Sequence, residues 1–221
     1  MIQLRSLPYI IDKFRGSQSI IDKSGGLICI DGFGKNLASL TNPIFEKAKK
    51  SLGNREATEI IAVNGIEKQI MLALKSYPDL LSTMRLHLGD VSFDVSYTFA
   101  TNYGEKSHRG SQLWHHDSVG RRLKLFLTAH PDSSPSLFVE NKRGGSISKP
   151  NIPLEERKLY SPTNAVKNIS MQPDDAYIVD TDYLHRGKIG MQGEQRLALV
   201  VEFSSKLKTL CRGRVGRRMN P

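Results

Sequence analysis

From residue 90 onward the chain alternates short apolar and polar segments with turn residues, and this pattern constrains the fold more than any other feature. Leu123, Leu125 and Leu127 would point to one face of a strand and the residues between them to the other. Many short strands separated by Gly, Pro, Asn and Ser are typical of a sandwich or barrel. We therefore predict a mainly β fold, a double-stranded β-helix (jelly roll), with strands at 91–101, 112–116, 123–130, 136–140, 176–180 and 196–204.

The first ninety residues have a different, helical pattern. Apolar spacing, a proline near a helix start and glycine or proline stops predict three helices, at 43–52, 65–76 and 79–88. The length of 221 residues fits a single domain. Within it we expect an α-rich N-terminal support (1–89), a jelly-roll core (90–205) and a basic C-terminal tail (206–221).

Composition narrows the class of protein. Hydrophobic residues make up 38% of the chain, which is enough for a core, and no apolar run is long enough to span a membrane. Residues 1–16 lack the apolar segment of a secretory signal. The two cysteines, Cys29 and Cys211, do not form a ligand-like pair and are expected to be reduced thiols. These features predict a cytoplasmic protein.

The formal net charge of +10 has two interpretations. Much of the excess lies in the tail, and further basic residues cluster at 121–124 and 142–143. One interpretation is attraction to a polyanion such as nucleic acid, a nucleotide-bearing thioester or an acidic surface. The other is a solvated terminus without a specific partner. No nucleic-acid-binding motif accompanies the charge.

Three residues have the spacing of a metal site. His115 and Asp117 lie two positions apart where a strand meets a turn, and His185 lies at the end of a later strand-like run. Two imidazoles and one carboxylate are the ligand set of mononuclear Fe(II) sites with open coordination positions. His116 should face away and is excluded as a ligand. Taken singly, each histidine could be a hydrogen-bonded core residue and Asp117 a turn cap.

Arg196 follows His185 by eleven residues and begins a strand. It shares one face with Ala198 and Val200, where a buried guanidinium is costly unless it meets an anion. A carboxylate is the natural partner, because the planar guanidinium can bind it in a bidentate fork. The alternative is a structural salt bridge to Glu202 or Asp180.

These segments resemble the phytanoyl-CoA dioxygenase-like group of 2-oxoglutarate/Fe(II)-dependent dioxygenases, which share the cupin-like jelly roll. The resemblance covers roughly residues 90–205 and rests on Trp-His-His-Asp at 114–117, Tyr-Leu-His-Arg-Gly at 183–187 and Arg196. It implies that His115, Asp117 and His185 bind Fe(II) and that Arg196 binds the distal carboxylate of 2-oxoglutarate. At Gly187 many members carry a hydroxyl that helps to hold this co-substrate.

The resemblance implies an enzyme that couples oxidative decarboxylation of 2-oxoglutarate to hydroxylation of a small-molecule substrate. That substrate is not identified by any motif, and the basic residues suggest that it is anionic or bound to a carrier. Two alternatives remain open: a cupin-type metal-binding protein without 2-oxoglutarate turnover, and an oxygenase that acts on nucleic acid. Trp114 is expected in the core, and Tyr183 either in the core or in the site.

Overall fold

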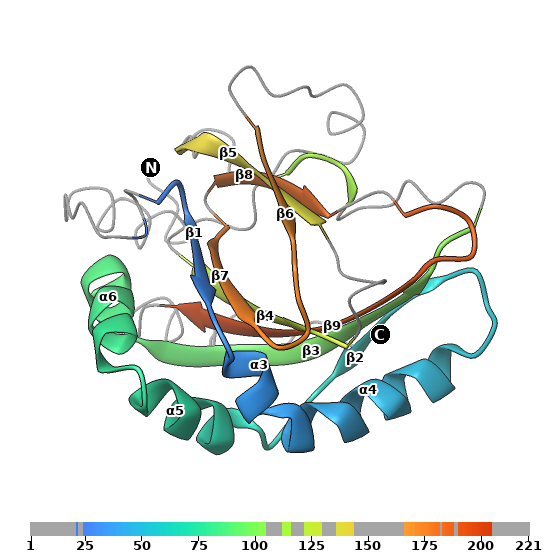
Figure 1. The fold of residues 1–221 in the computed structure, drawn as a ribbon, viewed down its shortest axis with the longest axis horizontal. Coiled ribbons are helices and arrows are strands. Elements are labelled where there is room, and N and C mark those ends of the chain that lie inside the picture. Colours follow the sequence, from blue (N-terminus) through green and yellow to red (C-terminus); the bar gives the residue numbers. More distant parts are fainter. Residues whose placement is uncertain are drawn as a thin grey trace, which may run out of the picture.

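The computed structural model describes part of the chain, and that part forms two packed β-sheets with helices on one side (Figure 1). The described residues are 21, 24–104, 112–115, 122–129, 136–143 (backbone only), 166–181, 183–187 and 190–204. The strands are β1 (Leu27–Ile30), β2 (Thr58–Ala62), β3 (Ser92–Asn102), β4 (Arg122–Thr128), β5 (Ser136–Arg143), β6 (Val166–Ser170), β7 (Ala176–Asp180), β8 (Tyr183–Gly187) and β9 (Gln195–Ser204). The helices are α3 (Phe33–Asn36), α4 (Ala38–Leu52), α5 (Glu67–Lys75) and α6 (Pro78–Leu88).

The large sheet has the strand order β1-β7-β4-β9-β3-β2, and the small sheet has the order β6-β5-β8. From β3 onward the chain passes repeatedly between the two sheets, and His115 pairs with His185 beside β8. This is the antiparallel arrangement of a jelly roll, so the predicted fold class is confirmed. The boundaries proposed for the support, core and tail stay a prediction, although β1 and β2 join opposite edges of the large sheet.

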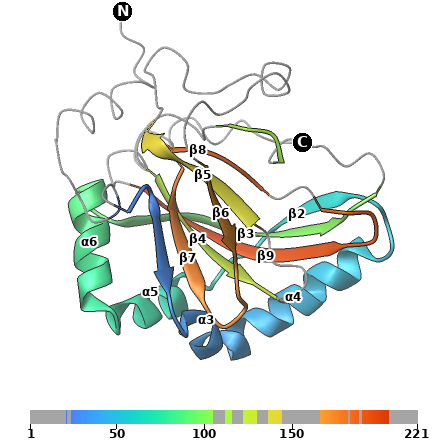
Figure 2. The ribbon, with the colours of Figure 1, turned by 45° about the horizontal axis from the view of Figure 1, so that its top comes forward.

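The outer face of the large sheet packs against the helices, as Figures 1 and 2 show. Leu125 and Leu199 are fully buried there, together with Met84 of α6 and Ile70 of α5, in one apolar cluster. Strand alternation therefore sends the leucines of β4 and β9 toward the helices and the intervening residues toward the small sheet. No helix in the described part of the chain is long and apolar enough to cross a membrane.

The inner face of the large sheet carries a second, more aromatic cluster. Its buried members are Leu27, Phe126, Ile169, Met171, Tyr177, Val179, Tyr183 and Val200, and the partly buried Tyr97 and Phe99 pack against them. Tyr183 comes from the small sheet, whereas Phe126 and Val200 face it from β4 and β9. Aromatic side chains from both sheets therefore pack together in part of the space between the sheets.

Two of the three predicted helices are confirmed within two residues at each end, namely α5 and α6. The third prediction is wrong at its start: α4 begins at Ala38, and Pro43 lies inside the helix. The helix begins before Pro43, with the amides of Leu40 and Thr41 donating to the carbonyl of Leu37. The predicted end at Leu52 is confirmed, with Gly53 following at a positive φ of 56°.

Five of the six predicted strands are present, and in the described part of the sixth, residues 112–115, a single β-bridge forms at His115. β8 was expected only as a strand-like run that ends at His185, and the strands β1, β2 and β6 were not predicted. They have only four or five residues, and β6 exposes all but one of its side chains, so their apolar alternation is weak. His185 lies in the middle of β8 rather than at the end of a strand.

The apolar cluster between the large sheet and the helices should contribute most to the free energy of unfolding. Replacing the fully buried Leu125 with Ala should lower the free energy of unfolding by about 3 kcal/mol, since it removes apolar contacts and leaves a cavity. Leu72 on α5 is 52% exposed, so the same substitution there should change stability by less than about 0.5 kcal/mol. Urea unfolding of both variants tests this, and equal losses would contradict the assigned core.

Candidate functional site

The structure brings His115 and His185 side by side. Each backbone N–H donates to the carbonyl of the other residue at 3.0 Å, so the two residues form a directly opposed antiparallel pair. Directly opposed residues point to the same face of a sheet, and the two imidazole centroids lie 4.4 Å apart. Both residues are buried, with 6% and 4% of their surface exposed.

Alternation along β8 shows which face the pair occupies. Tyr183 belongs to the aromatic cluster between the sheets, and His185 lies two residues further on the same face. Leu184, on the opposite face, packs with Trp114. The two imidazoles therefore project into the interior of the sandwich.

Backbone hydrogen bonds fix which nitrogen of each imidazole ring carries a proton. The Nδ1 of His115 lies 2.6 Å from the carbonyl of Leu113, and the Nδ1 of His185 lies 2.8 Å from that of Tyr183. A carbonyl can only accept, so Nδ1 carries the proton, and in the neutral ring Nε2 then presents a lone pair. Metal-binding histidines commonly have this arrangement, with one nitrogen bonded to a carbonyl. Two imidazolium cations at this spacing would repel each other, whereas two neutral rings can bind one cation.

Trp114 and Arg186 hold the two histidine-bearing segments together from the opposite face. The Arg186 guanidinium lies 4.8 Å from the centre of the Trp114 ring, a cation–π contact. Burial lowers the pKa of Arg186. Trp114 is 5% exposed, which agrees with its predicted place in the core. Asp117 and His116 lie outside the described residues, so the third predicted ligand and the excluded histidine stay predictions.

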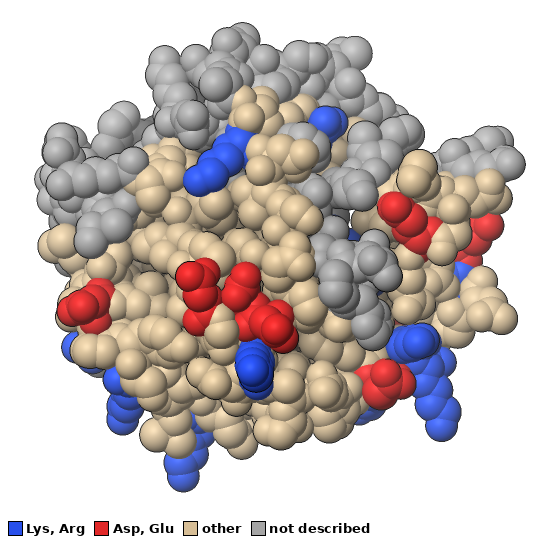
Figure 3. Space-filling view, in the orientation of Figure 1, with Lys and Arg blue, Asp and Glu red and all other residues tan. Residues whose placement is uncertain are grey.

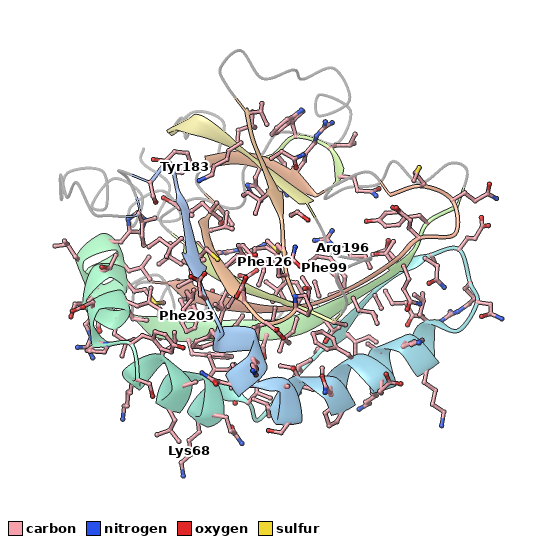
Figure 4. All side chains as sticks on the ribbon, in the orientation of Figure 1. Lys68, Phe99, Phe126, Tyr183, Arg196 and Phe203 are labelled. Carbon is pink, nitrogen blue, oxygen red and sulfur yellow. The ribbon has the colours of Figure 1, made fainter. Side chains whose placement is uncertain are left out.

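Arg196 lies on the inner face of the large sheet, near the start of β9 (Figure 4). It is only 4% exposed, and its guanidinium lies 5.5 Å from the centre of the Phe99 ring. Its Nε has no hydrogen-bond partner among the residues that the structure describes. A buried guanidinium without an anion is costly, so this position favours binding of an anion.

Neither Glu202 nor Asp180, the two partners proposed for Arg196, forms a salt bridge with it. Glu202 instead lies 3.0 Å from Arg122 and 3.3 Å from Lys124, and Asp180 lies 3.1 Å from His87. Glu202 shares the face of Arg196 but lies six residues away, which in a strand is about 20 Å. The described part of the protein therefore gives no support for a structural salt bridge at Arg196.

Phe99, Thr128 and Ala198 lie beside Arg196 on the inner face, and the sequence analysis named only Ala198 among them. Thr128 and Phe99 lie directly opposite Ala198 on the two neighbouring strands, so all three share the inner face with Arg196. Thr128 is 4% exposed, and its hydroxyl has no hydrogen-bond partner in the described residues. Ala198 is small, so little side chain stands between Phe99 and Thr128. The period-two register of β4 could have suggested Thr128, but its pairing with β9 could not be read from sequence.

A second set of potential ligands lies on the surface. The ligand atoms of Cys29, Asp31 and Asp175 are within 4.8 Å of one another, near β1 and α3, where Figure 3 shows acidic side chains. The Cys29 thiol donates to Asp31 Oδ1 at 3.3 Å. Partial burial, this hydrogen bond and the charge of Asp175 raise the pKa of Cys29 to about 11. The thiol is therefore protonated at neutral pH, and two of the three residues are exposed.

Solved structures of other proteins share the fold of this chain. No protein-family model matches the sequence, and no curated protein matches it. Among solved structures, the non-heme alpha ketoglutarate dependent epimerase SnoN from nogalamycin biosynthesis is similar at 13% identity, with 81% of this chain and 78% of that chain covered and a TM-score of 0.55. HygX from Streptomyces hygroscopicus, solved with nickel and 2-oxoglutarate bound, is 13% identical with 85% of each chain covered and a TM-score of 0.52.

EvdO2 from Micromonospora carbonacea var. aurantiaca is also similar, at 16% identity, with 86% of this chain and 92% of that chain covered and a TM-score of 0.52. At these identities the likeness shows a shared fold. SnoN is an alpha ketoglutarate dependent enzyme, and HygX was solved with 2-oxoglutarate bound. None of the three is described as a phytanoyl-CoA dioxygenase, so that narrower assignment stays a prediction.

The raised pKa of Cys29 predicts slow alkylation. In a Cys211→Ser background, the reaction with iodoacetamide at pH 7 should be about tenfold slower than for a free thiol, because little thiolate is present. The rate should rise with pH up to about 11. Asp31→Asn removes an accepting carboxylate and should shift this profile to lower pH. An inflection near pH 8.5 in the Cys211→Ser protein would contradict the described environment.

Proposed function

We propose that this protein is a non-haem Fe(II)- and 2-oxoglutarate-dependent dioxygenase that hydroxylates a small-molecule substrate. One observation carries the proposal: the Arg196 guanidinium is buried inside the sandwich, and no described carboxylate pairs with it. The His115–His185 pair projects into the same interior from the small sheet. A metal-binding pair and an anion-binding residue on facing sheets suit a co-substrate that has a chelating end and a carboxylate end.

The donor set fits iron. His115 and His185 would each bind through Nε2, because their Nδ1 protons are held by backbone carbonyls. Asp117, two residues after His115, would supply the carboxylate of a two-histidine, one-carboxylate site. When bound, iron would supply the activation of O2, with one oxygen atom entering succinate as 2-oxoglutarate loses CO2 and the other converting a substrate C–H bond to C–OH. Because Asp117 would fill the carboxylate position, we propose hydroxylation rather than halogenation.

The chain's own residues would orient the co-substrate. Arg196 would bind the distal carboxylate, with Thr128 donating its hydroxyl to the same group above Ala198. This would satisfy two buried polar groups at once, which is the physical reason for assigning them together. Thr128 would also replace the hydroxyl that is missing at Gly187. The binding of iron and 2-oxoglutarate by structurally similar proteins supports this assignment.

Succinate formation separates the proposal from its alternatives. A cupin-type protein without turnover would bind metal but would not convert 2-oxoglutarate. An oxygenase acting on nucleic acid would make succinate only when an oligonucleotide is present. SnoN is described as an epimerase, so the mass of the product, heavier by one oxygen or unchanged, separates hydroxylation from epimerisation.

Arg196→Ala should weaken 2-oxoglutarate binding by about a hundredfold, since it removes a charge-assisted contact inside a buried site. Binding of Mn(II), used as a redox-inert probe, should stay within about twofold of wild type, because Arg196 is not a proposed ligand. Calorimetric titration of each ligand measures both effects. If metal and 2-oxoglutarate binding fell equally, Arg196 would be structural and the proposal would lose its main support.

Thr128→Val keeps the shape of the side chain and removes its hydroxyl, so it should weaken 2-oxoglutarate binding by about tenfold. Thr98→Val is a matched control, because the Thr98 hydroxyl is also buried and also lacks a hydrogen-bond partner in the described region. Thr98 lies opposite Leu199 on the outer face of the sheet, away from Arg196. That variant should bind 2-oxoglutarate like wild type. Equal behaviour of the two variants would refute the role of Thr128.

A further inference from the structure

The two histidines of the candidate site are held by the small sheet to different extents. His185 lies in β8, which pairs with β5 along a ladder that places Val139 opposite His185. Within the described residues 112–115, only His115 pairs with β8, through one isolated bridge of two backbone hydrogen bonds. Register in a sheet is specified by the pattern of side chains, and so short a contact specifies it weakly. The position of His115 relative to His185 therefore depends on side chains that pack across the same bridge.

Trp114 and Arg186 form the neighbouring cross-strand pair, on the face opposite the imidazoles. They adjoin His115 and His185 in the two segments, so the antiparallel bridge places them opposite each other. The Cζ atom of Arg186 lies 4.8 Å from the centre of the Trp114 ring. Trp114 also packs with the fully buried Leu184. The indole ring is therefore in contact with both of the residues that flank His185 in β8.

These contacts favour the observed register over its neighbours. A shift by one residue would send the His115 ring to the opposite face of the sheet. A shift by two residues would keep the face but would separate the imidazoles by about 7 Å along the strand. In either case the indole would leave the guanidinium of Arg186, and the cation–π attraction would be lost. The attraction is effective here because Trp114 is buried and Arg186 is half-buried, so solvent screens it little.

A cation beside a histidine ligand is unfavourable in two ways. Partial burial disfavours the charged guanidinium and lowers the pKa of Arg186. A positive charge close to a site for a divalent cation also weakens metal binding by Coulomb repulsion. An apolar side chain would pack against Trp114 without either disadvantage, but it would not be attracted to the face of the indole ring. The contact with Trp114 thus gives a physical reason for a cation at this position.

We propose that Arg186 is a positioning residue for the metal site, which through Trp114 holds His115 in register with His185. The two Nε2 atoms then bind one ion with little rearrangement, and such preorganisation raises affinity. The effect on metal affinity rests on the proposed function, because it requires an ion between the two histidines. The effect on the bridge does not rest on that function, and it is measured in the metal-free protein.

The first measurement is amide hydrogen exchange of the metal-free full chain. Arg186→Met removes the guanidinium and keeps a long apolar side chain, so the amides of His115 and His185 should exchange about tenfold faster than in wild type. The amide of Leu199, inside the large sheet, should be unaffected. Trp114 is the only tryptophan of the chain, so a shift of its fluorescence to longer wavelength reports the same loosening. Unchanged exchange at both histidines overturns the proposal.

The second measurement is calorimetric titration with Mn(II) alone. Arg186→Met should weaken Mn(II) binding by about tenfold, although the loss of a nearby positive charge would by itself tighten it. Arg186→Lys keeps a cation opposite the indole and should weaken binding by only about threefold. Leu125→Ala is the control for lost stability, because it lies on the outer face of the large sheet, and it should bind Mn(II) like wild type.

Unchanged or tighter Mn(II) binding by Arg186→Met overturns the proposal, as does equal weakening in Leu125→Ala. If wild type does not bind Mn(II), the proposed function fails together with the metal role of Arg186. Amide exchange then decides by itself whether Arg186 holds the bridge.

A double variant separates the Trp114–Arg186 contact from the other interactions of either residue. Trp114→Leu removes the indole and should weaken Mn(II) binding at least as much as Arg186→Met does. Adding Arg186→Met to Trp114→Leu should then change the affinity by less than about twofold, because both substitutions remove one shared contact. If the second substitution weakens binding by its full tenfold, the two residues act independently and the proposal is overturned.

Discussion

The long antiparallel ladder between β3 and β9 determines most of what this molecule can do. It runs from Ser92 opposite Ser204 to Asn102 opposite Gln195, so one strand pair fixes both faces of the large sheet. Its outer face buries residues against the helices, and its inner face presents Arg196 at one end and Glu202 at the other. Because the side-chain period of a strand is two, a slip of one residue would send both charges into the helical core. The apolar residues of the outer face and the charged residues of the inner face therefore both favour the same register of β3 against β9.

Sequence periodicity predicted the elements that are buried on one or both sides and failed for those at the edges. The β4 and β9 patterns were visible because leucine and valine alternate with polar or small residues, and every residue of β4 is buried. β1 and β2 are short strands that pair on one side only, and four or five residues are too few to show a clear alternation. Pro43 suggested a helix start because proline favours that position, but the helix begins one turn earlier. Local rules find elements, whereas tertiary pairing decides where they begin.

For the site, spacing predicted that the two histidines could meet, and the structure places them side by side and buries Arg196 on the inner face of the large sheet, while their binding roles stay predictions. What sequence could not supply was the choice of partners. Glu202 and Asp180 were reasonable partners for Arg196, but strand geometry assigns them to Arg122 and Lys124 and to His87. The Nδ1–carbonyl bonds and the position of Thr128 depend on backbone register, which short-range patterns do not encode. Asp117 lies outside the described residues and remains a prediction from the His-x-Asp spacing alone.

The most direct test of the proposed site is a crystal structure of the protein with Mn(II) and 2-oxoglutarate. We expect one metal ion bonded to Nε2 of His115, Nε2 of His185 and the carboxylate of Asp117. We also expect the distal carboxylate of 2-oxoglutarate to be hydrogen-bonded to Arg196 and to the Thr128 hydroxyl. A metal ion held instead by Cys29, Asp31 and Asp175, or a co-substrate carboxylate placed away from Arg196, would contradict the proposed site.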